Sequence, residues 1–187
     1  MHGKMTMRQY QKKAMRTSPR DGHDKIDNGV LGLIGETGEL VDLWKKYKYQ
    51  STDDAELPRA KLAEELGDVL WYLAELADGM GEELLNISGK DFCVLDARFG
   101  NPGGRTHSVR KLVTGLAWRA SRLCRAADTV DAEELRIQIR RMLAGAARLA
   151  WRIGYSLEEV AAMNIAKLEK RYPEGFDPEI SMGRYEK

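Results

Sequence analysis

The sequence predicts an all-α protein organised as a helical bundle, and three observations support this fold class. Apolar residues recur at helical spacing along most of the 187 residues. Breaks that end or begin helices separate these stretches, notably at residues 17–19, at Pro58 and at residues 100–104. Ser156 with Glu159 forms a capping box, which is the signature of a helix start. A chain of this length has room for one domain with a sizeable core.

Each expected helix lies between two of these breaks. The first begins after Thr6, a favourable N-cap, and runs to Arg16, and a polar loop over residues 20–28 follows. The second covers residues 29–47, with lysines in its last turn, where cations suit the helix dipole. The later helices are expected over residues 58–77, 108–126, 131–153 and 156–172, with Ser108, the pair Asp131 and Glu134, and the pair Ser156 and Glu159 at the last three starts.

The composition restricts the class of function. The chain is 43% hydrophobic and 32% charged, and its net charge of +1 gives no overall attraction to nucleic acid or to membranes. It has no run of 18 apolar residues and no signal-peptide segment near Met1. Cys93 and Cys124 form no CxxC motif, which suits a reducing compartment. We therefore expect a cytoplasmic protein without nucleic-acid or membrane partners.

Two apolar stretches of helical period each carry a pair of acids, Glu36 with Glu39 and Glu65 with Asp68. The i,i+3 spacing places both carboxylates of a pair on one helix face. If the two helices pack antiparallel, four carboxylates converge in a half-buried place, where they repel one another unless a cation or protons neutralise them. A hard divalent cation resolves this repulsion, because Mg²⁺ prefers carboxylate and phosphate oxygens.

Other features bear on this interpretation. Acidic pairs at this spacing are common on solvated helix faces, which is the alternative interpretation. Gly35, Gly38 and Gly67 each cost a helix about 1 kcal/mol relative to alanine, so the close approach of a phosphate or of another helix is expected to compensate. The three histidines are scattered and offer no ligand spacing, which argues against zinc and against a dinuclear iron site.

The residues around the acids resemble a known family. Residues 32–40 read Gly-Leu-Ile-Gly-Glu-Thr-Gly-Glu-Leu, and residues 65–73 read Glu-Leu-Gly-Asp-Val-Leu-Trp-Tyr-Leu. With the late segment 164–176 and the early Tyr10-Gln11 and Thr17, they are similar to the MazG-like, all-α nucleoside triphosphate pyrophosphohydrolases. The metal motif of that family is ExxE on one helix and ExxD on the next. Many members carry a further acid where this chain has Gly35, which leaves the general base open between Glu36 and Glu64.

The resemblance implies a helical bundle of the MazG-like type that cleaves a nucleoside triphosphate between its α- and β-phosphates. Mg²⁺ is the implied cofactor, with Mn²⁺ as the alternative ion, and the implied assembly is a homodimer. The implied metal ligands and catalytic residues are Glu36, Glu39, Glu65 and Asp68, and the implied substrate-binding residues are Asn164, Lys167, Arg171 and Tyr172.

The chemistry of these side chains agrees with such a role. Lys167 binds phosphate as a point charge and Arg171 as a fork. Asn164 offers a donor and an acceptor to a base or sugar edge, and Tyr172 offers a ring for stacking. A dUTPase-like enzyme and a phosphoribosyl-ATP pyrophosphohydrolase are alternatives within the superfamily. A non-catalytic nucleotide-binding or scaffold protein is an alternative of another class, against which the intact set of four acids argues.

The two halves of the chain also resemble each other. Residues 30–40 match residues 113–123 with Gly32 opposite Gly115, and after a shorter linker residues 62–99 match residues 135–172 with Gly81 opposite Gly154. We therefore expect one all-α domain over residues 1–187 with repeat 1 at about 28–102 and repeat 2 at about 108–176. The repeats would form a pseudo-dimer about an approximate two-fold axis, and two such chains would form the homodimer.

The register predicts that repeat 2 has lost its metal site. Opposite Glu36, Glu39, Glu65 and Asp68 stand Arg119, Arg122, Gln138 and Arg141. Cationic side chains do not ligate Mg²⁺, so these residues are expected either to pair with local acids as a scaffold or to form an anion pocket. Repeat 2 retains the Asn and Lys of the late motif, so its last helix is expected to complete the one remaining site.

Overall fold

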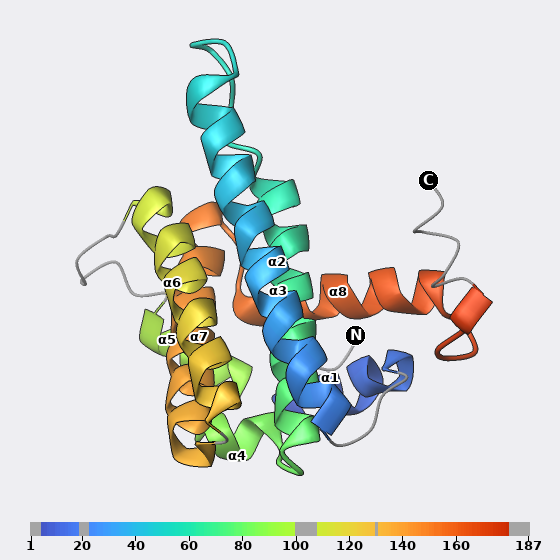
Figure 1. Ribbon diagram of the computed structural model, residues 1–187. Helices are drawn as coiled ribbons and strands as arrows, with labels where there is room; N and C mark the ends of the chain where they lie inside the picture. Colours follow the sequence, from blue (N-terminus) through green and yellow to red (C-terminus); the bar gives the residue numbers. More distant parts are fainter. Residues whose placement is uncertain (1–4, 19–22, 100–107, 130, 180–187) are drawn as a thin grey trace.

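The computed structural model describes residues 5–18, 23–99, 108–129 and 131–179, and every regular element in these ranges is a helix (Figure 1). The all-α fold class is confirmed. In chain order the elements are α1 (Met7–Ala14), the 3₁₀ helix η1 (Met15–Thr17), α2 (His23–Tyr49), α3 (Arg59–Gly79), α4 (Leu84–Ser88), α5 (Phe92–Phe99), α6 (Val109–Asp128), α7 (Ala132–Ile153) and α8 (Leu157–Arg171).

Most of the expected helix starts are found. Thr6 caps α1 in a full capping box with Gln9, Ser108 caps α6, and Ser156 with Glu159 forms the expected box at α8. At α7 the Asp131 side chain accepts a hydrogen bond from the Glu134 N–H. The reciprocal half of that box was predicted wrongly, because the Glu134 carboxylate accepts hydrogen bonds from Arg122 and Gln138 instead.

Helix α2 starts at His23, six residues before the expected position, so the loop predicted over residues 20–28 is wrong from residue 23 onward. Tertiary contacts stabilise this polar first part as helix. Lys25 pairs with Asp78 at 2.6 Å, and the Asn28 amide donates to the buried Glu75 carboxylate. All of these partners lie on α3, which is why local sequence did not reveal them.

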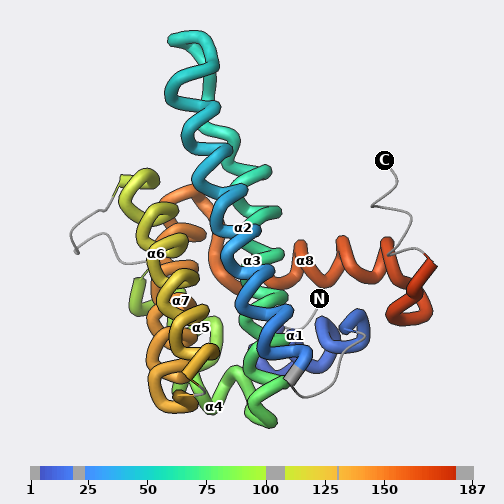
Figure 2. The backbone as a smooth tube through the Cα atoms, viewed as in Figure 1, coloured from blue at the N-terminus to red at the C-terminus, as the bar shows by residue number. Residues whose placement is uncertain are grey.

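Two helical hairpins, α2–α3 and α6–α7, form the centre of the molecule (Figure 1). They pack together chiefly through α2 against α6, and the far end of the α2–α3 hairpin projects beyond the other helices (Figure 2). The helices that follow each hairpin pack on the other hairpin. Helices α4 and α5, which follow α3, pack on α7, and α8, which follows α7, packs on α3. This exchange places a helix from the end of the chain against the hairpin from its beginning.

The central hairpins end in the same way. Gly81 follows α3 with a φ of 70°, and Gly154 follows α7 with a φ of 90°, in the left-handed region that favours glycine. The N–H of the next residue donates at 2.9 Å to the carbonyl of Ala77 in one case and of Ala150 in the other. These are the closing bonds of a Schellman motif, and they occur at positions that the sequence register sets opposite each other.

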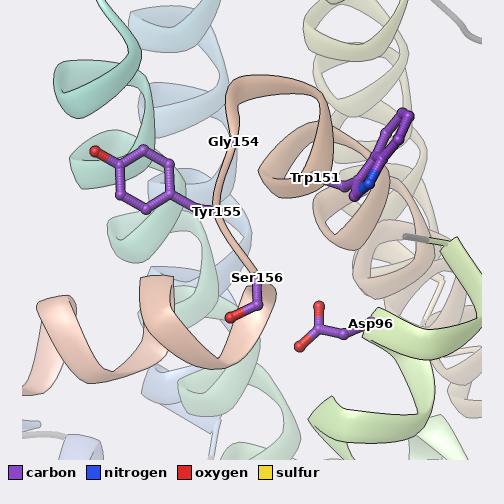
Figure 3. A pocket seen from close by; sticks show the side chains of 5 residues that line it. All are labelled: Asp96, Trp151, Gly154, Tyr155 and Ser156. Atoms are coloured by element: carbon purple, nitrogen blue, oxygen red, sulfur yellow. The ribbon is translucent and has the colours of Figure 1, made fainter. Parts of the chain in front are cut away.

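The start of α8 is fixed by a carboxylate from α5. Asp96 accepts hydrogen bonds from the backbone N–H of Leu157 at 2.7 Å and of Glu158 at 3.3 Å. Asp96 also lines a hollow of about 300 Å³ with Trp151, Gly154, Tyr155 and Ser156 (Figure 3). Because its carboxylate is occupied with the N-terminus of α8, this hollow is part of the turn that directs α8 toward α3.

None of the helices in the described ranges combines the length and the apolar character that a membrane crossing requires. Cys93 and Cys124 are both free thiols.

Gly67 on α3 permits the close approach of α8, and this generates a prediction about stability. A Cβ atom at Gly67 would lie 2.9 Å from the Cβ of Asn164, which is buried and cannot easily move. We expect Gly67→Ala to lower the free energy of unfolding by about 1–3 kcal/mol in urea denaturation, because overpacking outweighs the gain in helix propensity.

Gly35→Ala is the matched control, since a Cβ atom there meets nothing within 4 Å. It is expected to raise the free energy of unfolding by up to about 1 kcal/mol. Stabilisation by both substitutions would contradict the close packing of α8 on α3.

Candidate metal centre

Three carboxylates converge where α2 and α3 pack together. Glu36 comes from α2, and Glu65 and Asp68 come from one face of α3. Each offers one oxygen atom, and these oxygens all lie within 4.8 Å of one another. All three residues are partly buried. The convergence expected from the acid spacing is therefore present for three of the four predicted acids.

Glu39 is the fourth predicted acid, and it does not belong to this group. It lies about one turn beyond Glu36 on α2, and it is exposed. Its charge nevertheless contributes to raising the pKa of Glu36 and of Glu65. Its role as a ligand stays a prediction.

Burial makes the negative charge in this cluster unfavourable. Burial, followed by the charges of Asp68, Glu65 and Glu39, raises the pKa of Glu36 from 4.5 to about 7. The pKa of Glu65 is raised as well, first by burial and then by Asp68. A cation placed among the three oxygens would relieve both causes, because it replaces lost hydration and cancels the repulsion.

Two residues of α8 reach the same place from the other end of the chain. The Asn164 amide donates a hydrogen bond to one oxygen of Asp68 at 3.1 Å, and the Lys167 ammonium lies 2.5 Å from the other. Lys167 also pairs with Glu64 at 3.4 Å. Burial alone would lower the pKa of Lys167, but the hydrogen bonds and charges of Asp68 and Glu64 together outweigh it, so the pKa is raised. Lys167 therefore remains an ammonium beside the carboxylates.

Tyr10 orients the Asn164 amide. Its hydroxyl donates at 2.9 Å to the Asn164 side-chain oxygen, so the amide nitrogen faces Asp68. Tyr10 is fully buried, and burial together with the charge of Asp68 raises its pKa well above 10. No local pattern predicted this contact, and only the likeness of Tyr10-Gln11 to the family's opening helix drew attention to the position.

The other two predicted substrate-binding residues lie at the end of α8. Arg171 lies one turn beyond Lys167 on the same helix face. Tyr172 is buried at the helix C-cap, with its ring centroid 6.1 Å from that of Phe176. Within the described part of the chain, neither side chain forms a hydrogen bond or ion pair with the carboxylates, of which Asp68 is paired with Asn164 and Lys167. Their roles in substrate binding stay predictions.

The residues opposite the acids lie on α6 and α7. Arg122 pairs with Glu134 at 2.7 Å, and Gln138 is fully buried and donates to the same carboxylate. This pairing agrees with the expected scaffold role for Arg122. Arg119 and Arg141 form no ion pair with a described carboxylate.

The carboxylate cluster fits a hard divalent cation. All of its donors are oxygens, and no histidine or cysteine belongs to the group found among the described residues. Neighbouring oxygen ligands of Mg²⁺ stand about 2.9 Å apart, so oxygens separated by up to 4.8 Å would move closer together or bind the ion partly through the waters that it retains. The donor chemistry thus excludes neither Mg²⁺ nor Mn²⁺ and disfavours softer metals.

Comparison with known proteins relates the residues around the cluster to a protein family. The family model for the MazG nucleotide pyrophosphohydrolase domain matches residues 26–92, which contain Glu36, Glu65 and Asp68. The Gene 37 protein of Mycobacterium phage L5 is 30% identical over 79 residues, which is 42% of this chain and 69% of the phage protein. No solved structure was found to match the chain. Asn164 and Lys167 lie outside the residues that the family model matches.

The raised pKa of Glu36 predicts how stability depends on pH when no metal is present. The unfolded chain loses this proton near pH 4.5, but the folded chain keeps it until about pH 7. Glu36 therefore lowers the free energy of unfolding progressively between these values and fully above pH 7. In EDTA we expect Glu36→Gln to raise the free energy of unfolding by about 1–3 kcal/mol at pH 8 and by almost nothing at pH 4.

Urea denaturation of both proteins across this pH range measures the effect. Glu56→Gln, which changes an exposed carboxylate in the α2–α3 loop, is the control and should show no such gain. An equal gain for Glu36→Gln at pH 4 and pH 8 would mean that ionisation of Glu36 is not the cause.

Proposed function

Since the chain belongs to the MazG-like superfamily of all-α nucleotide pyrophosphohydrolases, we propose that it hydrolyses a nucleoside triphosphate to the monophosphate and pyrophosphate. The reaction depends on Mg²⁺, for which Mn²⁺ can substitute. The observation that carries this proposal is the convergence of Glu36, Glu65 and Asp68 in a half-buried place that Lys167 also reaches. Such a site can hold a metal ion and the phosphates of a nucleotide together.

In this proposal Glu36, Glu65 and Asp68 are the metal ligands, and Glu39 joins them from the next turn of α2. The bound ion supplies neutralisation of phosphate charge and activation of the attacking water. Gly35 and Gly38 leave space beside the carboxylates, since a Cβ atom at either position meets nothing within 4 Å. This space supports the approach of a phosphate group there.

The residues of α8 bind and orient the substrate. Lys167 contributes a point charge for a phosphate oxygen, and Arg171 is positioned one turn further on to contribute a second. Asn164, held by Tyr10, keeps Asp68 in its orientation. Of the two candidate proton acceptors, Glu36 is favoured over Glu64, because Glu36 is partly buried whereas Glu64 is exposed and paired with Lys167.

A pyrophosphate-release screen over the common NTPs and dNTPs, with and without Mg²⁺, tests the activity. We expect turnover of at least one nucleotide with Mg²⁺ and none in EDTA. Glu65→Ala and Asp68→Ala should each lower kcat by more than about 100-fold, because each removes a charge that holds the ion. Glu56→Ala is the control outside the cluster. Full activity of both cluster variants would refute the metal assignment.

The same screen separates the alternatives. A preference for dUTP would indicate a dUTPase-like enzyme. Turnover of phosphoribosyl-ATP, added to the panel, would indicate a phosphoribosyl-ATP pyrophosphohydrolase. Inactivity toward every compound, with nucleotide binding retained, would favour the non-catalytic alternative.

We also propose that the chain is an internally duplicated pseudo-dimer. The support is the sequence register, the matching Schellman turns at Gly81 and Gly154, and the exchange in which α5 packs on α7 and α8 packs on α3. One metal site then remains per chain, and repeat 2 completes it through α8.

Lys167→Ala tests this contribution from repeat 2. Loss of a charged contact to phosphate is expected to lower kcat/KM by about 10–100-fold. Lys167→Arg should recover part of that loss, whereas the exposed Lys170→Ala on the same helix should have little effect. Unchanged kcat and KM in Lys167→Ala would refute a role for α8. Calorimetric metal titration should find one class of site per chain, and two equivalent sites would contradict the loss of the second.

A further inference from the structure

A hollow of about 230 Å³ lies between α6 and α7, and all the charged side chains that line it are cations. Lys111 and Arg119 come from α6, two helical turns apart on one face, and Arg148 comes from α7. The rest of the wall consists of leucine and glycine, including Gly115 and Gly145. We call this hollow the α6–α7 pocket.

The α6–α7 pocket exists because a large side chain is missing. In the α2–α3 hairpin the position opposite Gly145 is Tyr72, and the Tyr72 ring packs so closely on Gly32 that a Cβ atom there would lie 2.1 Å from it. In the α6–α7 hairpin both facing residues are glycines, and a Cβ atom at Gly115 would meet nothing within 4 Å. A Cβ atom at Gly145 would lie 3.0 Å from the Leu116 side chain, so the space that Tyr72 fills in one hairpin is open on the Gly115 side in the other.

The charges at the two places also differ. In the α2–α3 hairpin the corresponding positions are Asn28 and Glu75, and the Asn28 amide donates a hydrogen bond to the Glu75 carboxylate. In the α6–α7 hairpin Lys111 and Arg148 stand there, so a neutral donor and a carboxylate have become two cations. No pairing between these two residues can replace the lost hydrogen bond, because both are donors only.

The cations of the α6–α7 pocket lack carboxylate partners among the residues that the structure describes. Partial burial lowers the pKa of Arg119, and the neighbouring charges of Arg141, Arg148 and Arg122 lower it further. Burial and then the charge of Arg98 lower the pKa of Arg148. Positive charge is thus concentrated in a partly desolvated place, where an anion would relieve the repulsion.

Aromatic rings restrict the two arginines before any ligand binds. The Arg148 guanidinium lies 4.2 Å from the centroid of Phe99, and that of Arg119 lies 5.6 Å from the centroid of Trp118. A guanidinium held on a ring loses less freedom when it binds phosphate oxygens, so the pocket is partly preorganised.

We propose that the α6–α7 pocket is a second binding site, which takes a small phosphate polyanion such as pyrophosphate through Lys111, Arg119 and Arg148. Its volume is below the range of about 300–1,000 Å³ that accommodates larger ligands, so a whole nucleotide does not fit inside. Arginine forks and a lysine point charge match several phosphate oxygens at once. This site needs no metal ion, and it is independent of the proposed hydrolysis.

Calorimetric titration of inorganic pyrophosphate into the full-length protein in EDTA tests the proposal. Without a cation the carboxylate cluster repels the anion, so binding reports on the α6–α7 pocket. We expect one site per chain, with sulfate at least tenfold weaker because it carries less charge. Absence of binding at millimolar pyrophosphate, or equal affinity for sulfate, would overturn the proposal.

Substitutions locate the site. Arg119→Gln and Arg148→Gln should each weaken pyrophosphate binding at least tenfold, whereas Arg125→Gln, an exposed position on α6 outside the pocket, should not. Equal weakening by all three would show a general effect of net charge and overturn the assignment. Gly115→Leu fills the pocket and keeps every cation, and it should abolish binding in a protein that still folds. Retained binding in Gly115→Leu would equally overturn it.

Discussion

The contacts of one carboxylate, Asp68, connect the beginning, middle and end of this chain. Its two oxygens are occupied by Asn164 and Lys167 of α8, and Tyr10 of α1 holds the Asn164 amide in the orientation that this requires. These contacts join residues about 100 or more positions apart, so they form only when the hairpins have assembled. The candidate site is therefore a product of the whole fold, although the family match covers residues 26–92 alone. Gly67 is part of the same arrangement, because only a residue without a side chain lets α8 approach this face of α3.

The clustered acids lower the stability of the folded protein, so their presence calls for a functional explanation. Burial and mutual repulsion raise the pKa of Glu36 to about 7, and Lys167 provides partial neutralisation when no metal is bound. A purely structural role would be served better by apolar residues of similar size. A cluster that lowers stability unless a cation binds is the arrangement expected of a metal site, where strain is accepted for function.

Local signals in the sequence predicted the helices and their caps, because i,i+3 spacing and capping chemistry depend on neighbours within a few residues. Features that depend on residues far away in the chain could not be predicted from the sequence. The early start of α2 depends on Asp78 and Glu75 of α3, and the short helices α4 and α5 are stabilised by packing on α7. The acid spacing placed Glu36, Glu65 and Asp68 together but gave no measure of how far Glu39 stands from them. The contact between Tyr10 and Asn164 spans nearly the entire chain and leaves no local pattern at all.

The two hairpins carry side chains of opposite charge at matching positions of similar helical scaffolds. In α2–α3 the facing positions carry carboxylates, and Tyr72 fills the space against Gly32. In α6–α7 arginines stand at most of the matching positions, Gly145 stands opposite Tyr72 in the register, and a Cβ atom at Gly115 would meet nothing within 4 Å. In a symmetric homodimer both hairpins would change together, so acids could not be replaced without losing every metal site. Under the proposed duplication, joining two copies in one chain removes that constraint. In that case the hairpin without the carboxylates is free to form the proposed anion pocket, while the last helix of its repeat serves the proposed metal site of the other hairpin.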